Sequence, residues 1–111
     1  MAFAEKELGQ LRPANTTAAS IYNVGTSTTA IIKTVIVCNT SGVSAKFRLF
    51  LDKDGTTYDE TTALFWDRFC DADASVVIHP FSVMTDSNGN LAVRTNVADA
   101  LTFTTYGAEI I

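Results

Sequence analysis

Short apolar segments rich in β-branched residues alternate with turn residues along the whole chain, and this spacing limits the folds that the chain can adopt. The strongest segment, AIIKTVIVCN (30–39), is nearly continuous in apolar residues, which predicts a central strand covered on both faces. SAKFRLFLD (44–52) alternates apolar and charged residues, as a strand with one buried and one wet face does. Turn signals recur every ~8–12 residues, and helical periodicity is nearly absent. The pattern predicts an all-β fold, an antiparallel β-sandwich or a small jelly-roll-like barrel of roughly seven to eight strands.

Further strands and turns follow from the same reasoning. Gly55 ends a hairpin-type turn and is suited to a positive φ. Gly107 interrupts the alternation of the last strand, which indicates a bulge or a close backbone approach. TTALFWDRFCDADAS (61–75) fits either a short helix or an irregular, anchored loop. The other expected strands are 19–24, 75–79, 91–97 and 100–111, and the other clear turn is 85–90, centred on Asn88-Gly89.

The length and composition agree with one β domain. A chain of 111 residues is expected to be a single domain and can hold a core without metal or disulfides. Sixteen threonines favour pleated, half-buried surfaces because β-branched side chains are stiff at χ1. Residues 1–17 are mixed and polar, so we expect an N-terminal arm or an early edge segment there. Residues 18–111 are expected to form the sandwich domain.

The net charge and its distribution limit the classes of partner that the protein can bind. The net charge of −4 argues against nucleic acid, which requires clustered Lys and Arg. Residues 1–50 carry five basic and two acidic residues, net +3, whereas residues 51–111 carry three basic and ten acidic residues, net −7. This asymmetry could orient copies in an assembly or reflect solvated loops.

No signal peptide or membrane span is predicted. Cys38 and Cys70 match no metal-ligand spacing, and we expect reduced thiols and cytoplasmic folding, with a Cys38–Cys70 disulfide left open.

No motif in the sequence predicts catalysis or a cofactor. His79 is the single histidine, and no GxSxG turn presents a serine to it. DKDGTTYDE looks like a calcium loop, but an EF-hand alignment places Phe50 and Thr61 where acidic ligands belong. A different calcium site built from Asp52, Asp54 and Asp59 stays open. The acidic residues near 59–73 do not by themselves define the paired carboxylates of a glycosidase. We therefore expect no enzyme activity.

An aromatic segment and the two termini are the candidates for contact with a partner. Phe65, Trp66 and Phe69 could form a binding platform, or Phe65 or Trp66 could plug one end of the sandwich. The chain ends on Ile110 and Ile111 without a polar tail. These two residues are expected at a rim, against either the N-terminal arm or a neighbouring subunit.

Residues 19–111 resemble a group of small β-sandwich virion proteins of tailed bacteriophages. The resemblance rests on an early IYNV strand, on TTAIIKTVIVCNTSGVSAKFRLFL, on the segment ALFWDRF and on the ending SNGNLAVRTNVADALTFTTYGAEII. The stretch DADASVVI departs from the pattern, which often has a threonine there. The resemblance implies a non-enzymatic structural protein, folded in the host cytoplasm and located in the virion, that forms trimers or other small oligomers.

The first functional prediction is a capsid cement or decoration protein that contacts the major capsid protein or a neighbouring virion protein. A tail- or head-fibre-associated protein of the same fold is the second. The third is a carbohydrate-binding module in which Trp66, with Tyr58 or Tyr106, stacks on sugar rings. The residues expected at the interface are Glu5, Leu8, Leu11, Arg12, Phe65, Trp66, Phe69, Ile110 and Ile111.

Overall fold

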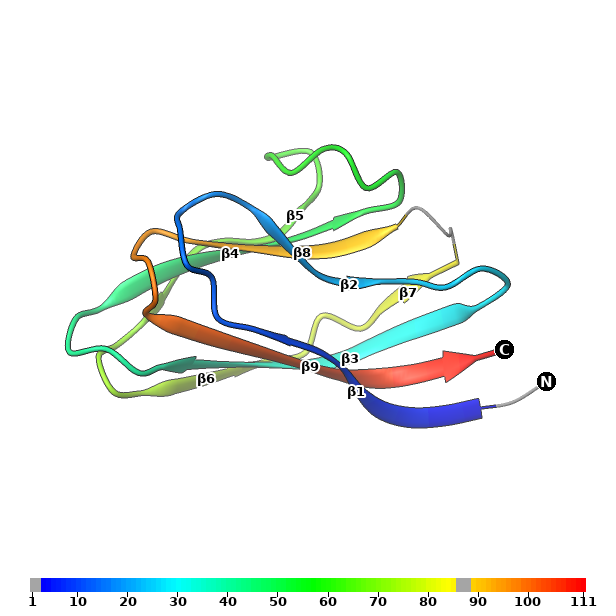
Figure 1. Ribbon diagram of the computed structural model, residues 1–111, viewed down its shortest axis with the longest axis horizontal. Coiled ribbons are helices and arrows are strands. Elements are labelled where there is room, and N and C mark those ends of the chain that lie inside the picture. The colour runs from blue at the N-terminus through cyan, green and yellow to red at the C-terminus, as the bar shows by residue number, and fades with distance from the viewer. Residues whose placement is uncertain (1–2, 86–88) are drawn as a thin grey trace.

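The computed structural model describes residues 3–85 and 89–111, and these form a sandwich of two antiparallel sheets (Figure 1). The strands are β1 (Phe3–Leu11), β2 (Ala19–Asn23), β3 (Thr29–Asn39), β4 (Ala45–Asp52), β5 (Ala63–Cys70), β6 (Ser75–Ile78), β7 (Ser82–Met84), β8 (Asn90–Thr95) and β9 (Leu101–Ile110). The predicted all-β sandwich is confirmed. The structure has nine strands in its described residues, against an expected seven to eight. No strand was expected at β5 or β7, and at β1 an edge segment was one of two alternatives.

Each sheet combines segments that are distant in sequence. One sheet has the order β1-β9-β3-β6, and β7 pairs with β3 beside β6. The other has the order β2-β8-β4-β5. Strand β1 begins and strand β9 ends at the same end of the molecule, where Phe3 pairs with Ile110 (Figure 1). The turn expected at 85–90 lies partly outside the described residues.

Strand β3 is central, but only one of its faces is covered. It pairs with β9 on one side and with β6 and β7 on the other. Ala30, Ile32, Val35 and Val37 are fully buried between the sheets. Their neighbours in sequence are only half-buried, so the expectation of cover on both faces is wrong. The second face has no layer above it, because the chain contains two sheets rather than three layers.

Strand β4 confirms the alternation read from its sequence. Phe47 and Leu49 are buried in the core, and Lys46 and Arg48 lie on the other face. Phe50 shares that outer face yet is buried. The loop between β4 and β5 rises over this sheet in Figure 1, and Tyr58 of that loop packs on the Phe50 ring at 6.0 Å.

The aromatic segment forms an edge strand. Residues 63–70 form β5 beside β4, so the expectation of a short helix or an irregular loop at 61–75 is wrong. The register shifts between Phe47 and Leu49, and Asp67 takes a positive φ of 52°. A bulge of this kind breaks the alternation that would have indicated a strand.

Residues 3–11 form the edge strand β1, paired along its length with β9. They therefore lie in the sheet, which matches the edge-segment alternative and not a detached arm. Gly9 allows β1 to approach β2 closely, because a Cβ on Gly9 would lie 2.1 Å from the Ile21 carbonyl oxygen. This contact closes one side of the sandwich.

The predicted irregularity at Gly107 is confirmed. The register of β9 shifts against both neighbours at this level, at Leu8 in β1 and at Lys33 in β3. A Cβ on Gly107 would lie 2.0 Å from the Ile31 carbonyl oxygen and 3.0 Å from Leu8 Cδ1. Only a residue without a side chain fits between the two bulges. The positive φ expected at Gly55 is also found, at 70°.

The core is apolar and well filled. Phe47 and Phe103 meet edge to face across the two sheets, with ring centroids 5.7 Å apart. Cys38 and Cys70 are both free thiols. Burial raises the pKa of the Cys70 thiol, which lies 3.5 Å from the Ala74 carbonyl oxygen. No helix within residues 3–85 and 89–111 is long and apolar enough to cross a membrane.

Candidate interaction surfaces

The three predicted aromatic residues divide between the core and the outer surface. Phe65 is half-buried and packs against the core. Trp66 and Phe69 lie on the outside of β5, with 42% and 60% of their surface exposed. The segment therefore serves partly to anchor β5 to the core, and Trp66 and Phe69 present more surface to a partner than Phe65 does.

The Trp66 side chain is held in place by Arg48, which is itself fixed by an ion pair with Asp67. The Arg48 guanidinium lies over the indole, with Cζ 3.6 Å from the ring centroid. Arg48 Nε and Nη2 donate to the two carboxylate oxygens of Asp67 at 2.7 and 3.2 Å. The hydrogen bonds from Arg48 lower the pKa of Asp67 below its usual range. Phe50 meets the indole edge to face at 6.3 Å. The indole is thus fixed in orientation, and one of its faces is covered.

This arrangement leaves little of the expected sugar platform. A sugar stacks on a free aromatic face, and Arg48 occupies one face of Trp66. The Tyr58 ring packs on Phe50, and its hydroxyl donates to the Gly55 carbonyl at 3.2 Å. Tyr106 lies on β9 in the opposite sheet, too remote to share a sugar with Trp66.

The predicted residues of the N-terminal segment mostly serve the fold. Leu8 and Leu11 are half-buried and pack against the core. Arg12 Nη2 donates to the Asp99 carbonyl oxygen at 2.5 Å, which ties the end of β1 to the turn before β9. Glu5 forms an ion pair with Lys33 on the outer face. Glu5 and Arg12 are both exposed, whereas Leu8 and Leu11 are not.

The C-terminal isoleucines lie beside β1, at the rim of the sheet. Ile110 pairs with Phe3 on one side and with Thr29 on the other, and it is half-buried. Ile111 follows the strand and is exposed. Of the N-terminal candidates, Glu5 lies near this corner, opposite Ala108, whereas Leu11 lies opposite Phe103 towards the other end of β9. The structure places the aromatic candidates on the other sheet.

A cluster of polar side chains at this corner, formed by Lys6, Tyr22 and Glu109, was not predicted from the sequence. The Glu109 carboxylate binds Lys6 Nζ at 2.6 Å and accepts a hydrogen bond from the Tyr22 hydroxyl at 2.6 Å. The Lys6 contact is the main reason that the pKa of Glu109 is lowered. Burial, together with Glu109, raises the pKa of Tyr22. The cluster joins β1 and β9 to β2 of the opposite sheet, so it braces the sandwich.

A second apolar surface was also missed, and we call it the β6–β7 patch. It consists of Val77, Phe81 and Val83, all strongly exposed, with Ile31 and Ile36 half-buried beside them. Val77 pairs with Ile36 and Val83 pairs with Ile31, so these four side chains share the outer face of one sheet edge, and Phe81 lies in the connection between β6 and β7. The SVVI alternation alone indicates that Val77 points outward. Its apolar neighbours are known only from the strand pairing.

His79 adjoins the β6–β7 patch. Its ring stacks on Phe81 with centroids 6.0 Å apart, and Nδ1 lies 3.3 Å from the Thr34 hydroxyl.

Within residues 3–85 and 89–111, no group of three His, Cys, Asp or Glu side chains is arranged to hold a metal ion. The Asp52 carboxylate instead accepts hydrogen bonds from the backbone N–H groups of Asp54, Thr56 and Thr57 at 3.1, 2.8 and 2.6 Å. Asp52 therefore shapes its own loop.

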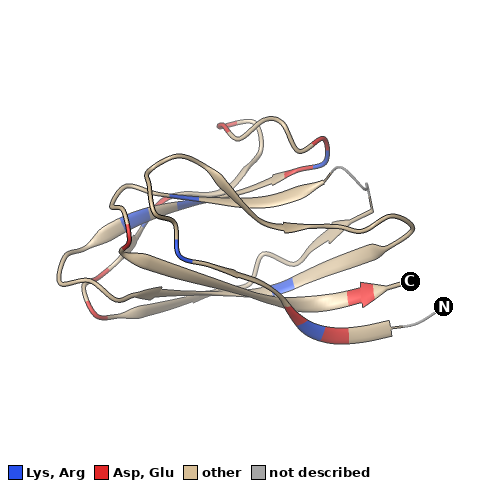
Figure 2. Ribbon diagram, in the orientation of Figure 1, with Lys and Arg blue, Asp and Glu red and all other residues tan. Residues whose placement is uncertain are grey.

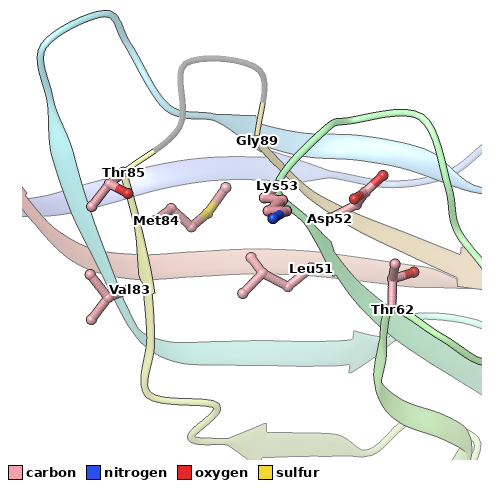
Figure 3. A pocket seen from close by; sticks show the side chains of 8 residues that line it. All are labelled: Leu51, Asp52, Lys53, Thr62, Val83, Met84, Thr85 and Gly89. Atoms are coloured by element: carbon pink, nitrogen blue, oxygen red, sulfur yellow. The ribbon is translucent and has the colours of Figure 1, made fainter.

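A pocket of about 430 Å³ opens between the end of β4 and strand β7 (Figure 3). Leu51, Val83 and Met84 give it an apolar wall, and Lys53 lies at its rim (Figure 3). Thr85 and Gly89 border it, and the residues that join them lie outside the described part of the chain. Asp52, Thr62 and Thr85 also line it, but the Asp52 carboxylate already binds the backbone of its own loop, and no ligand site is assigned to the pocket.

Comparison with known proteins identifies the fold. No family model matches the sequence, and no curated protein matches it. A chain in the structure of infectious bursal disease virus, Gx strain, is 14% identical with a TM-score of 0.55, over 97% of this chain and 32% of that chain. This protein thus spans about a third of the length of the virus chain. The Drosophila NLP-core, described with respect to pentamer formation and histone binding, is 11% identical with a TM-score of 0.50, over 98% of both chains. At these identities the similarity concerns the fold alone.

Proposed function

We propose that the protein is a non-enzymatic virion structural protein of a tailed bacteriophage, and specifically a capsid cement or decoration protein. It would bind at the junctions between capsid subunits and stabilise them by the free energy of that binding, without catalysing a reaction. The proposal combines the sequence resemblance with one observation on the structure, the β6–β7 patch. An exposed apolar sheet edge of this kind is typical of a surface that pairs with another chain.

The patch is suited to self-association. β6 and β7 lie at an edge of their sheet, where unpaired backbone groups accompany the exposed side chains. Val77 is 51% exposed and Val83 61% exposed. Covering each would contribute roughly 1 kcal/mol by burial of apolar area. A homo-oligomer is therefore expected, and the family resemblance favours a trimer.

The structural neighbours are consistent with this proposal. A sandwich of the same fold occurs within a virus structure, and another occurs in a protein described as forming pentamers. The fold thus accommodates repeated side-by-side packing. The identities are too low to transfer a symmetry or a partner from either one.

The oligomer is tested by light scattering on a size-exclusion column. The expected mass is about three times the 12.0 kDa of one chain. Val77→Lys and Val83→Lys should shift the mass toward one chain, because a lysine cannot be buried without a partner. Val43→Lys is the matched control, since Val43 is 54% exposed in the turn before β4, away from the patch. A wild-type monomer, or equal effects of all three substitutions, would refute the role of the patch.

The location in the virion is tested by cosedimentation with particles of the phage that encodes the chain. Purified protein is mixed separately with tail-free heads and with isolated tails. A cement protein should sediment with heads in a saturable amount. Sedimentation with tails alone would instead establish the tail- or fibre-associated alternative. Binding to neither would refute both.

A further inference from the structure

Three basic side chains surround one small hollow on the outer face of the four-stranded sheet. The hollow has a volume of about 60 Å³ and is lined by Lys46, Arg48, Asp67, Arg94, Thr95 and Asn96. Figure 2 shows the basic positions of β4 and β8 close together on this sheet. The chain has only eight lysines and arginines and a net charge of −4, so the hollow is positively charged on a protein that is negatively charged overall.

The strand pairing places two like charges face to face. Arg48 and Arg94 are directly opposite each other in the antiparallel pair of β4 and β8. Like charges in this relation destabilise a sheet unless an anion lies between or beside them. Asp67 reaches Arg48, and Glu60 adds a weaker attraction to Arg48 from a greater distance. Asp67 therefore hydrogen-bonds to Arg48, and it attracts Lys46 and Arg94 only through space.

The other two cations are not neutralised in the same way. Arg94 Nε donates to the Thr16 carbonyl at 2.9 Å, which fixes the side chain and leaves both Nη groups without a partner among the described residues. Lys46 Nζ lies 5.0 Å from the Phe69 ring centroid and forms no ion pair with a residue that the structure describes. The hollow thus holds three cations against the single carboxylate of Asp67.

The surroundings of the hollow indicate the class of ligand. Arg and Lys donors recognise carboxylate or phosphate oxygens. Trp66 and Phe69 are exposed on β5 on either side of Asp67. Exposed aromatics beside arginine are characteristic of binding hot spots in protein interfaces. Tracking a nucleic acid backbone requires many more cations, and the net negative charge of the chain opposes it.

We infer that this outer face, consisting of Lys46, Arg94, Arg48, Trp66 and Phe69, binds an acidic segment of a protein partner. A partner carboxylate would enter between Arg94 and Lys46, and an apolar side chain next to it would pack on Trp66 and Phe69. The inference rests on the proposed function in one respect, which is that the partner is a neighbouring virion protein. The binding chemistry does not depend on the β6–β7 patch, which lies on the other sheet.

The single tryptophan reports on this surface directly. The probe is an acetylated and amidated oligo-glutamate peptide with one central leucine, titrated while Trp66 fluorescence is recorded. The expected result is a saturable change that weakens as salt is added. The same peptide with glutamine in place of glutamate should produce no change. Arg94→Gln and Lys46→Gln should each weaken binding roughly tenfold to a hundredfold, which corresponds to the loss of a charged hydrogen-bond partner.

Arg68→Gln is the matched control. Arg68 is an exposed arginine on β5 that lies over Phe65 and does not line the hollow. Equal weakening by Arg68→Gln, or equal binding of the glutamine peptide, would overturn the inference. Tighter binding of a single-stranded oligonucleotide that also depends on Arg94 would assign the hollow to phosphate instead. If the wild-type protein does not bind the peptide but has the expected oligomer mass and cosediments with heads, this inference is refuted and the proposed function stands.

Discussion

Gly107→Ala is the substitution whose cost can be worked out most directly. The new methyl carbon would lie 2.0 Å from the Ile31 carbonyl oxygen and 3.0 Å from Leu8 Cδ1. Heavy atoms do not approach to 2.0 Å without a bond, and the obstructing atom belongs to the backbone of β3. Strand β9 must therefore move away from β3 at the point where the two bulges meet.

The expected loss is about 3 kcal/mol in the free energy of unfolding. Overpacking a filled site costs roughly 1–3 kcal/mol. Disturbing the adjacent ladder adds roughly 1 kcal/mol for each hydrogen bond that is lost. Each kcal/mol lowers Tm by roughly 4 °C in a domain of this size, so we expect Tm to fall by about 12 °C.

The assay is urea and thermal unfolding of both proteins at the same chain concentration, because oligomerisation makes Tm depend on concentration. Gly42→Ala is the control, since a Cβ there meets nothing within 4 Å and the residue has no positive φ. That variant should be neutral or slightly stabilised, because alanine restricts the unfolded chain. If Gly107→Ala stays within about 0.5 kcal/mol of the wild type, the tight approach of β9 to β3 is refuted.

Three further predictions concern the carboxylates, the thiols and the core. The folded-state pKa values of Asp52 and Glu109 lie below their ordinary values of 3.8 and 4.5, chiefly through the Thr57 N–H and Lys6, so the unfolded chain binds protons first as the pH falls. Their stabilisation should be fully present above about pH 5 and lost as the pH falls through the lowered pKa values, and acid unfolding followed by circular dichroism would contradict this if stability stayed constant down to pH 2. Cys38 is half-buried and should react with a thiol reagent in the native protein, whereas Cys70 is fully buried and should react only on unfolding; equal native rates would contradict the packing of β5. Phe47→Ala should cost about 3–5 kcal/mol by opening a cavity, measured by urea unfolding, and a loss below about 1 kcal/mol would show that the core is not closely packed there.

The fold class could be predicted because it depends on patterns along the chain. Strand β4 alternates over its whole length, and that period of two assigns Phe47 and Leu49 to the core. The glycine that breaks the alternation of β9 marked its irregularity. Strand β5 was not predicted from its sequence. The bulge at Asp67 interrupts the alternation of apolar and polar residues, so the aromatic residues of this segment resembled a helix or a loop.

The candidate contact residues were predicted by type and not by location. Trp66 and Phe69 were identified because large aromatics beside charges suit an interface, and both are exposed. Arg12 was expected to contact a partner but is occupied by the Asp99 carbonyl. A sequence does not show which backbone group lies next to a side chain, and Asp99 is 87 residues away along the chain.

The β-sandwich and the central position of β3 could be predicted from the amino-acid sequence, because the hydrophobic period and the turn residues are local properties. The surfaces that remain exposed depend instead on the packing of distant segments. The β6–β7 patch exists because β3 brings Ile31 and Ile36 beside valines more than forty positions away. The basic hollow exists because the register of β4 and β8 sets Arg48 opposite Arg94. Both surfaces depend on strand pairing between distant segments, and pairing is decided by the free energy of the whole packed sandwich.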